Sequence, residues 1–122
     1  MLARGTCGYA SLARAIGEAH LAGGEKGYPA YEMARLADLS KGDWVVLTGC
    51  RKAAVPAALL RDGPAAANQV LAAMISCFGR DNVVVELWDH GDPLDSARND
   101  ALVELAVKQN LRVVATNNVH YA

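Results

Sequence analysis

Three short apolar segments rich in β-branched residues are the strongest constraint on the fold of this 122-residue chain. They read WVVLT (44–48), NVVVELW (82–88) and LRVVAT (111–116). Their apolar residues follow one another without regular polar alternation, which is typical of strands buried on both faces of a parallel sheet. We therefore expect three strands of this buried type.

Segments with helical periodicity precede and separate these strands. Apolar residues spaced three and four apart predict amphipathic or buried helices, and the expected helices cover residues 9–21, 31–39, 56–60, 64–79 and 95–109. Asp62 and Asp95 are expected to cap the last two helices, and Gly79 to end the fourth. Strands that alternate with helices long enough to cross over indicate parallel βαβ units, so we predict the α/β class.

Composition excludes several classes of protein. A net charge of -1 gives no global attraction to nucleic acid or to anionic membranes, and no apolar run approaches the length of a membrane helix. The three cysteines follow no CxxC spacing, which argues against a disulfide framework or a zinc ribbon and favours a reducing, cytoplasmic setting. The length suits one domain at most.

Polar and reactive residues follow each expected strand. They are Thr48, Gly49 and Cys50 after the first, Asp89, His90 and Asp92 after the second, and Asn117, Asn118 and His120 after the third. The carboxyl ends of parallel strands share one face of a sheet, and that face carries the ligand sites of α/β folds. Thiolate, imidazole and carboxylate groups on one rim suit a metal ion.

Several candidate residues also have an ordinary structural interpretation. Cys50 is either a metal ligand or a small buried hydrophobe, and His90 is either a ligand or a loop residue bonded to local backbone. Glu86, inside the second strand, either pairs with a cation or contributes to a site, because an unpaired buried carboxylate is costly. His120 has no obvious packing purpose, and His20 is expected at a helix end.

Several motifs together carry a family resemblance. The stretches LARAIGEAHLAGGEKG, LTGCRKAAVPAAL, FGRDNVVVELWDHGDP, RNDALVELA and VVATNNVHYA resemble the PHP (polymerase and histidinol phosphatase) domain of bacterial C-family DNA polymerases, the DNA polymerase III alpha-subunit family. The HLAGGEKG loop and the TNN spelling are most similar to the error-prone, damage-tolerant branch. The resemblance spans nearly the whole chain.

This resemblance implies a distorted (β/α)7 barrel with parallel strands, crossover helices and a cluster of divalent metal ions (zinc, manganese or magnesium) at the rim. The family's metal-binding cysteine falls on Cys50, and its Asp-x-His ligand pair falls on Asn118 and His120. Asn118 departs from that pattern. Because an amide offers a weaker, neutral oxygen, the affinity for metal should fall, so binding in this chain is expected to be weak or absent.

A second departure is the missing His-x-His pair of the family's first strand. Residues 1–122 therefore resemble only the later part of a PHP domain, without the polymerase domains that follow it, so Met1 is interpreted as an internal or artificial start and Ala122 as a premature end.

The expected function is that of a fragment of an error-prone DNA polymerase, a nucleotidyltransferase of DNA replication and damage-tolerant repair. In it this region would serve as a scaffold or a vestigial metal site without catalytic residues, partnered by the rest of the polymerase chain and, through it, by DNA and dNTPs. The alternative is a stand-alone metal-dependent phosphoesterase or 3'-5' exonuclease. There, Cys50, His120 and Glu86 would bind one ion, and Arg51 or Lys52 would meet the phosphate.

Overall fold

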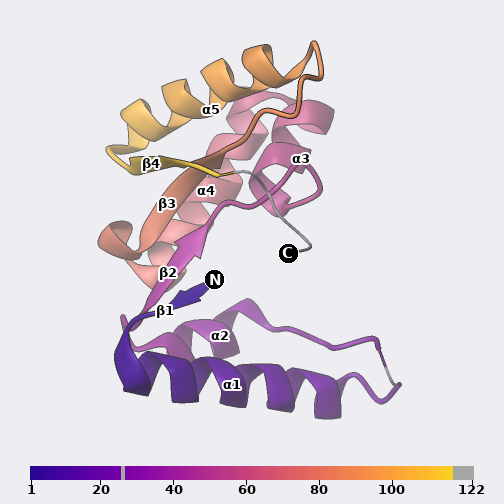
Figure 1. Cartoon of the computed structure of the whole chain (residues 1–122), viewed down its shortest axis with the longest axis vertical. Coiled ribbons are helices and arrows are strands. Elements are labelled where there is room, and N and C mark those ends of the chain that lie inside the picture. Colours follow the sequence, from indigo (N-terminus) through magenta and orange to yellow (C-terminus); the bar gives the residue numbers. More distant parts are fainter. Residues whose placement is uncertain (26, 117–122) are drawn as a thin grey trace. The chain divides into compact units, whose positions relative to one another are not determined.

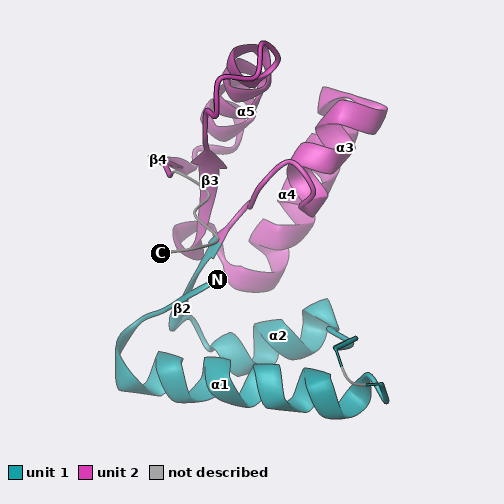
Figure 2. Cartoon of the chain, turned by 45° about the vertical axis from the view of Figure 1, so that its right-hand side comes forward, with its two compact units in different colours: residues 1–46 teal, residues 47–122 magenta. Residues whose placement is uncertain are grey.

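The structure, a computed structural model, describes residues 1–25 and 27–116. It is mixed α/β and comprises two compact units, Met1–Val46 and Leu47–Ala122 (Figure 2). The elements described are, in chain order, β1 (Leu2–Ala3), α1 (Gly5–Ala22), α2 (Met33–Ser40), β2 (Trp44–Leu47), α3 (Ala54–Asp62), α4 (Pro64–Phe78), the 3-10 turn η1 (Arg80–Asn82), β3 (Val83–Leu87), α5 (Asp95–Gln109) and β4 (Arg112–Ala115) (Figure 1).

The first unit packs α1 against α2 and pairs β1 with the start of β2 in antiparallel register, with Leu2 opposite Val45. Its anchor is the buried ring of Trp44, whose Nε1–H donates to the backbone oxygen of Gly8 at 3.0 Å and to Ser11 Oγ at 2.9 Å. Both partners lie in α1, so these bonds fix the strand to the helix. The strand β1 was not predicted, because two residues are too short to carry a pattern.

The second unit places β3 beside β4, with α5 packed against both strands and α4 against β3 (Figure 1). The two strands are parallel, with Val85 opposite Val113 and Leu87 opposite Ala115. Fully buried apolar side chains of the strands and helices form its core: Val55, Ala67, Leu71, Val83, Val85, Leu102 and Ala106. The predicted parallel pairing is therefore confirmed for β3 and β4.

The predicted helices are all present, and His20 lies exposed in the last turn of α1 as expected. Both predicted caps are wrong. Gly63, with φ of +86°, is the N-cap of α4, and the Asp62 carboxylate instead accepts from Arg61 Nε at 2.8 Å. Asp95 lies one residue inside α5, and its carboxylate turns back to the preceding loop. None of the helices described is long and apolar enough to cross a membrane.

The expectation of strands buried on both faces is only partly met. The first three residues of β3 are buried, β2 alternates between buried and half-buried positions, and all four residues of β4 are exposed. A continuous apolar run indicates that a strand is suited to burial. The strand is buried on both faces only where other elements pack against each face. In the described part of the chain β4 packs against β3 and α5 and keeps Val113 and Val114 exposed.

Two glycines of α1 give a matched test of the first unit. A Cβ added at Gly8 would lie 2.5 Å from the backbone oxygen of Asp43, whereas one added at Gly17 would meet nothing within 4 Å. We expect Gly17→Ala to stabilise the protein by about 0.5–1 kcal/mol, because alanine loses less backbone entropy in a helix. Gly8→Ala should instead lower the midpoint of thermal unfolding followed by circular dichroism. Equal effects of the two substitutions on the midpoint would contradict the close contact between Gly8 of α1 and the backbone of Asp43.

Candidate functional site

The site is built where β2 and β3 end, and Thr48 fixes the first of these ends. Its backbone N–H donates to the Val84 oxygen at 3.1 Å, and its Oγ1 accepts from the Glu86 N–H at 2.9 Å. Thr48 is buried, and a buried amide needs a hydrogen-bond partner. The Thr48 hydroxyl is that partner for the Glu86 N–H. The chain therefore leaves β2 from a fixed position.

A tight turn follows. Gly49 has φ of +80°, and a Cβ on it would lie 2.7 Å from the Ala53 Cβ, so the chain passes close to the start of α3. The Ala53 N–H donates to the Cys50 oxygen at 2.8 Å, which places Arg51 and Lys52 at the two central positions of the turn. Both cations are exposed, and Cys50 is half-buried.

Glu86 lies on β3, and its backbone N–H is the donor to Thr48 Oγ1 described above. Its Oε1 accepts a hydrogen bond of 2.7 Å from the hydroxyl of Thr116, which directly follows β4. The side chain is half-buried, and no ion pair to it occurs among residues 1–25 and 27–116. Of the two predicted roles, the cation pair is therefore not found in this part of the chain, and the partner is a neutral hydroxyl.

The loop between β3 and α5 is held by the carboxylate of Asp95, which is only 1% exposed. Its Oδ2 accepts from the backbone N–H of His90 at 2.8 Å and of Asp92 at 3.3 Å, and its Oδ1 pairs with the guanidinium of Arg98. The His90 N–H holds the pKa of the Asp95 carboxyl below its ordinary value, with further contributions from Arg98 and the Asp92 N–H, although burial opposes the shift.

Trp88 connects this loop to the core. Arg98 stacks over its indole ring at 4.1 Å from the ring centroid, and the imidazole of His90 lies 5.1 Å from it, centroid to centroid. The Nδ2 of Asn99 donates to the Trp88 oxygen at 3.0 Å. Arg98 therefore pairs with Asp95 on one side and with an aromatic face on the other.

The two other carboxylates of the loop make local turns. Asp89 Oδ1 accepts from the Gly91 N–H at 2.8 Å, and Asp92 Oδ1 accepts from the Leu94 N–H at 2.9 Å. Both are side-chain bonds to backbone two residues on, a pattern that stabilises turns. The polar residues after β3 thus hold their own loop together.

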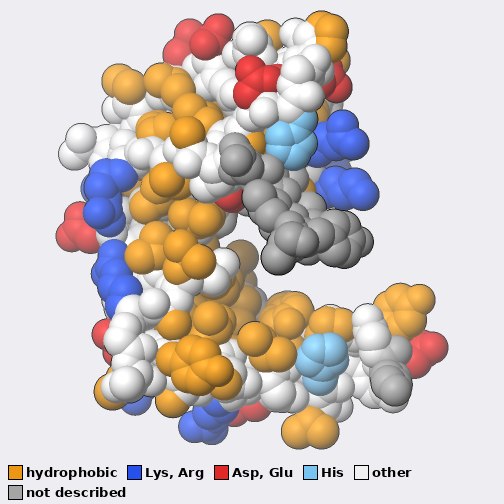
Figure 3. Space-filling model, in the orientation of Figure 1, with side chains coloured by type: hydrophobic (Ala, Val, Ile, Leu, Met, Phe, Trp, Pro, Cys, Tyr) orange, Lys and Arg blue, Asp and Glu red, His pale blue; other side chains and the backbone are white. Residues whose placement is uncertain are grey.

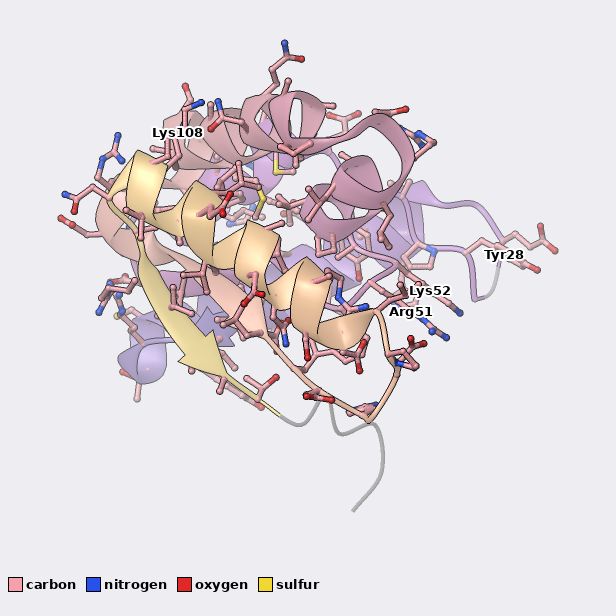
Figure 4. The ribbon with its side chains drawn as sticks, turned by 90° about the horizontal axis from the view of Figure 1, so that it is seen from above. Tyr28, Arg51, Lys52 and Lys108 are labelled. Carbon is pink, nitrogen blue, oxygen red and sulfur yellow. The ribbon has the colours of Figure 1, made fainter. Side chains whose placement is uncertain are left out.

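The ends of β2 and β3 line one open cleft of about 610 Å³. Its walls are formed by Cys50, Arg51, Lys52, Trp88, His90, Gly91, Asp92 and Asp95. Figure 3 shows a histidine beside basic side chains on this unit, and in Figure 4 Arg51 and Lys52 lie next to each other. The predicted meeting of the first two strand ends is therefore found. Asn117, Asn118 and His120, predicted to join them, lie outside the described residues.

The described residues do not fit a bound metal ion. Within residues 1–25 and 27–116 no group of three His, Cys, Asp or Glu side chains is placed to hold one. Asp95 is occupied by Arg98 and by two backbone amides, so its oxygens are not available as ligands. Cys50 as a ligand stays a prediction.

Sequence reasoning missed Asp95 and Arg98 as the centre of this loop. A signal was present, since an aspartate and an arginine three residues apart at the start of a helix can pair. It did not indicate that the pair would be buried under Trp88, because that depends on how α5 packs.

Asp95 should make the stability of the protein depend on pH. Because its pKa is lowered in the folded state, its contribution is full above the ordinary aspartate pKa and is lost as the pH falls toward the lowered value. We expect Asp95→Asn to lower the thermal midpoint at neutral pH by several degrees, since Arg98 stays buried without its counter-ion. The loss of stability on acidification should also become shallower than in the unsubstituted protein.

Asp100→Asn is the matched control, because Asp100 lies exposed on the same helix. It should leave both the midpoint and its dependence on pH unchanged. Identical acid profiles for Asp95→Asn and the unsubstituted chain would show that the Asp95 carboxylate does not hold the loop.

Comparison with known proteins places these features in a family. The PHP domain model matches residues 1–90. Over 122 residues the chain is 48% identical to an error-prone DNA polymerase of Mycobacterium tuberculosis (strain ATCC 25618 / H37Rv), covering 100% of this chain and 11% of that protein. It is 47% identical over 123 residues to an error-prone DNA polymerase of Cutibacterium acnes, again covering 100% of the chain and 11% of the relative.

A third relative has a different name. The DNA polymerase III subunit alpha of Thermus aquaticus is 35% identical over 122 residues, covering 99% of this chain and 10% of that protein. The chain thus spans about a tenth of the length of the curated relatives it matches. The match of the family model to residues 1–90 and the identities along the whole chain confirm the predicted resemblance, and the chain belongs to the PHP domain family.

Proposed function

We propose that this chain is part of the PHP domain of an error-prone DNA polymerase of DNA replication and damage-tolerant repair, acting in the cytoplasm. The identity of 48% along the whole chain to a protein of that name supports this assignment. In the proposal, residues 1–122 are the later part of the domain, and their strands belong to a distorted (β/α)7 barrel. The rest of the polymerase is the partner, and DNA and dNTPs are bound through it.

Within that polymerase the proposed role is that of a scaffold. The observation that carries this proposal is the bonding of the carboxylates in and next to the cleft, between β3 and the start of α5. Asp89 and Asp92 bond backbone amides two residues on, and Asp95 bonds two amides and Arg98. Side chains used in this way stabilise a loop and are poorly available for binding metal or transferring protons.

PHP domains generally bind divalent metal ions. In this proposal the chain binds such an ion with lower affinity than other members of the family. The proposed remnant of the site is Cys50 with Asn118 and His120. An asparagine oxygen carries no charge, whereas divalent cations with hard-ligand preferences favour carboxylates. The proposed site therefore binds metal weakly.

The scaffold proposal predicts an inactive chain. Purified protein dialysed against zinc or manganese should hold less than one equivalent of metal, because its donors are few and one of them is neutral. Cys50→Ala should leave the metal content nearly unchanged, and neither primer extension nor hydrolysis of phosphodiesters should be detected. Metal content by mass spectrometry and a primer-template assay check these outcomes.

The contrasting function is the stand-alone metal-dependent phosphoesterase. It requires a stoichiometric metal that is lost on Cys50→Ala combined with His120→Ala, together with hydrolysis that is lost in the same variant. That pair of results would replace the scaffold proposal with an enzymatic one.

The proposed barrel makes a prediction about β4. Its four residues are exposed, with Val113 at 42% and Val114 at 36%, and exposed apolar strands pair with other chains. We expect the chain alone to self-associate in sedimentation velocity, and Val113→Lys to increase the monomer fraction, since lysine on an edge strand opposes pairing. Val107→Lys, at an exposed position of α5, is the control and should leave the monomer fraction unchanged.

A monomer at all concentrations for the unsubstituted chain would argue that β4 is covered without further strands. In that case the barrel part of the proposal fails, whereas the assignment to the family is unaffected.

A further inference from the structure

The first unit carries an apolar groove between α1 and α2, which we call the α1–α2 groove. Two hollows of about 240 and 320 Å³ share three of their lining residues, so they form one continuous groove. Its lining is mostly apolar and includes Leu12, Ala15, Ile16, Ala19, Tyr31 and Leu36. Figure 3 shows hydrophobic side chains over these two helices.

The floor of the α1–α2 groove is made of small side chains and its walls of large ones. Ala15 and Ala19, one turn apart on α1, are 3% and 5% exposed. Ile16 and Tyr31 beside them are 45% and 51% exposed. Large apolar side chains that stay exposed around a hollow mark an interaction surface in soluble proteins. The groove therefore has both the room and the apolar walls to take side chains of a partner.

The charged side chains of the groove differ in their bonding. The Oε1 of Glu18 accepts from Arg14 Nε at 2.7 Å, and Arg35 donates to both Glu18 oxygens at 2.8 and 2.9 Å. These bonds join α1 to α2 and occupy the Glu18 carboxylate. Glu32 lines the same hollow and forms no ion pair among residues 1–25 and 27–116. A partner with a basic side chain would complement this end of the groove.

The rest of the polymerase polypeptide is the partner best placed to cover this surface. The relatives align along the whole chain, which is 11% of their length, so most of such a polypeptide lies outside these 122 residues. The groove lies within residues 1–90, which the PHP domain model matches. A segment of the same polypeptide has a far higher effective concentration than a second chain in solution.

We propose that the α1–α2 groove is the docking surface for an apolar segment of the polymerase polypeptide outside these 122 residues, and that this segment carries a lysine or arginine opposite Glu32. The inference rests on the proposed function and names the surface through which the scaffold holds the rest of the polymerase. Apolar side chains of the segment cover Ala15 and Ala19, and the basic group pairs with Glu32 at the rim.

A photo-reactive benzoylphenylalanine in place of Tyr31 identifies what covers the groove. In the full-length polymerase that contains these residues, irradiation should join position 31 to a peptide from outside the 122 residues, and mass spectrometry identifies that peptide. It should be apolar and contain a lysine or arginine. The same probe in place of Tyr28 is the matched control, because Tyr28 is 70% exposed and projects outward in Figure 4. It should not give this product.

The other cross-linking outcomes count against the proposal. A product that joins position 31 to a second copy of the polypeptide would show that the groove is an interface between copies. A product within the same 122 residues would show that the chain covers its own groove. The absence of any product would show that the groove stays open. Each of these results overturns the proposed docking.

Ile16→Glu separates a docking contact from a structural role inside the first unit. It should lower the thermal midpoint of the full-length polymerase by several degrees, because a carboxylate would be buried against the docked segment. It should change the midpoint of the 122-residue chain much less, since Ile16 is exposed there. Leu21→Glu, at an 85% exposed position of α1 outside the groove, is the matched control and should change neither midpoint.

The charge of Glu32 gives a second variant with the same readout. Glu32→Lys should lower the midpoint of the full-length polymerase more than Glu32→Gln, because it places two cations opposite each other. Equal midpoints for the Ile16→Glu and Leu21→Glu polymerases would contradict the docking proposal.

Primer extension by the same full-length protein tests the proposed function separately. A protein that extends primers but gives no cross-link from position 31 overturns the docking proposal alone. A protein that does not extend primers overturns the assignment as a polymerase, and with it the partner named for the groove.

Discussion

The buried carboxylate of Asp95 is the interaction on which the cleft depends. It binds the backbone of the loop after β3, and it neutralises Arg98, which in turn covers Trp88. A buried guanidinium without this counter-ion would be costly, and a buried carboxylate without its amides equally so. Each group is tolerable only because the other is present. The shape of the cleft wall therefore follows from one mutually dependent set of bonds rather than from the apolar core beneath it.

Much of the fold could be predicted because the apolar pattern of each element is local. The helices and the strands β2, β3 and β4 were recognised within a few residues of their bounds. Two features were not recoverable from local pattern. Helix caps depend on backbone geometry, so Gly63 took the place expected for Asp62. Burial depends on covering elements, so β4 is exposed although its residues are as apolar as those of β3.

The candidate site was predictable in position and less so in chemistry. Parallel strands bring their carboxyl ends to one edge, which is why Cys50 and His90 line one cleft although forty residues separate them in the sequence. The chemistry depends on what each polar atom bonds. Asp92 was a candidate ligand by residue type, and its carboxylate is used in a turn. Residue type shows which groups could bind a metal ion. The hydrogen bonds that a group already makes decide whether it is available to do so.

The same reasoning separates the charge of a carboxylate from its availability as a ligand. The carboxylates of Asp89 and Asp92 bond amides of their own loop, which makes them poorer metal ligands while their negative charge stays beside the cleft. Arg51 and Lys52, at the two central positions of a closed turn, form no ion pair within the described part of the chain. The edge where β2 and β3 end therefore carries acidic and basic side chains together, and their bonding partners rather than their number decide what each can do.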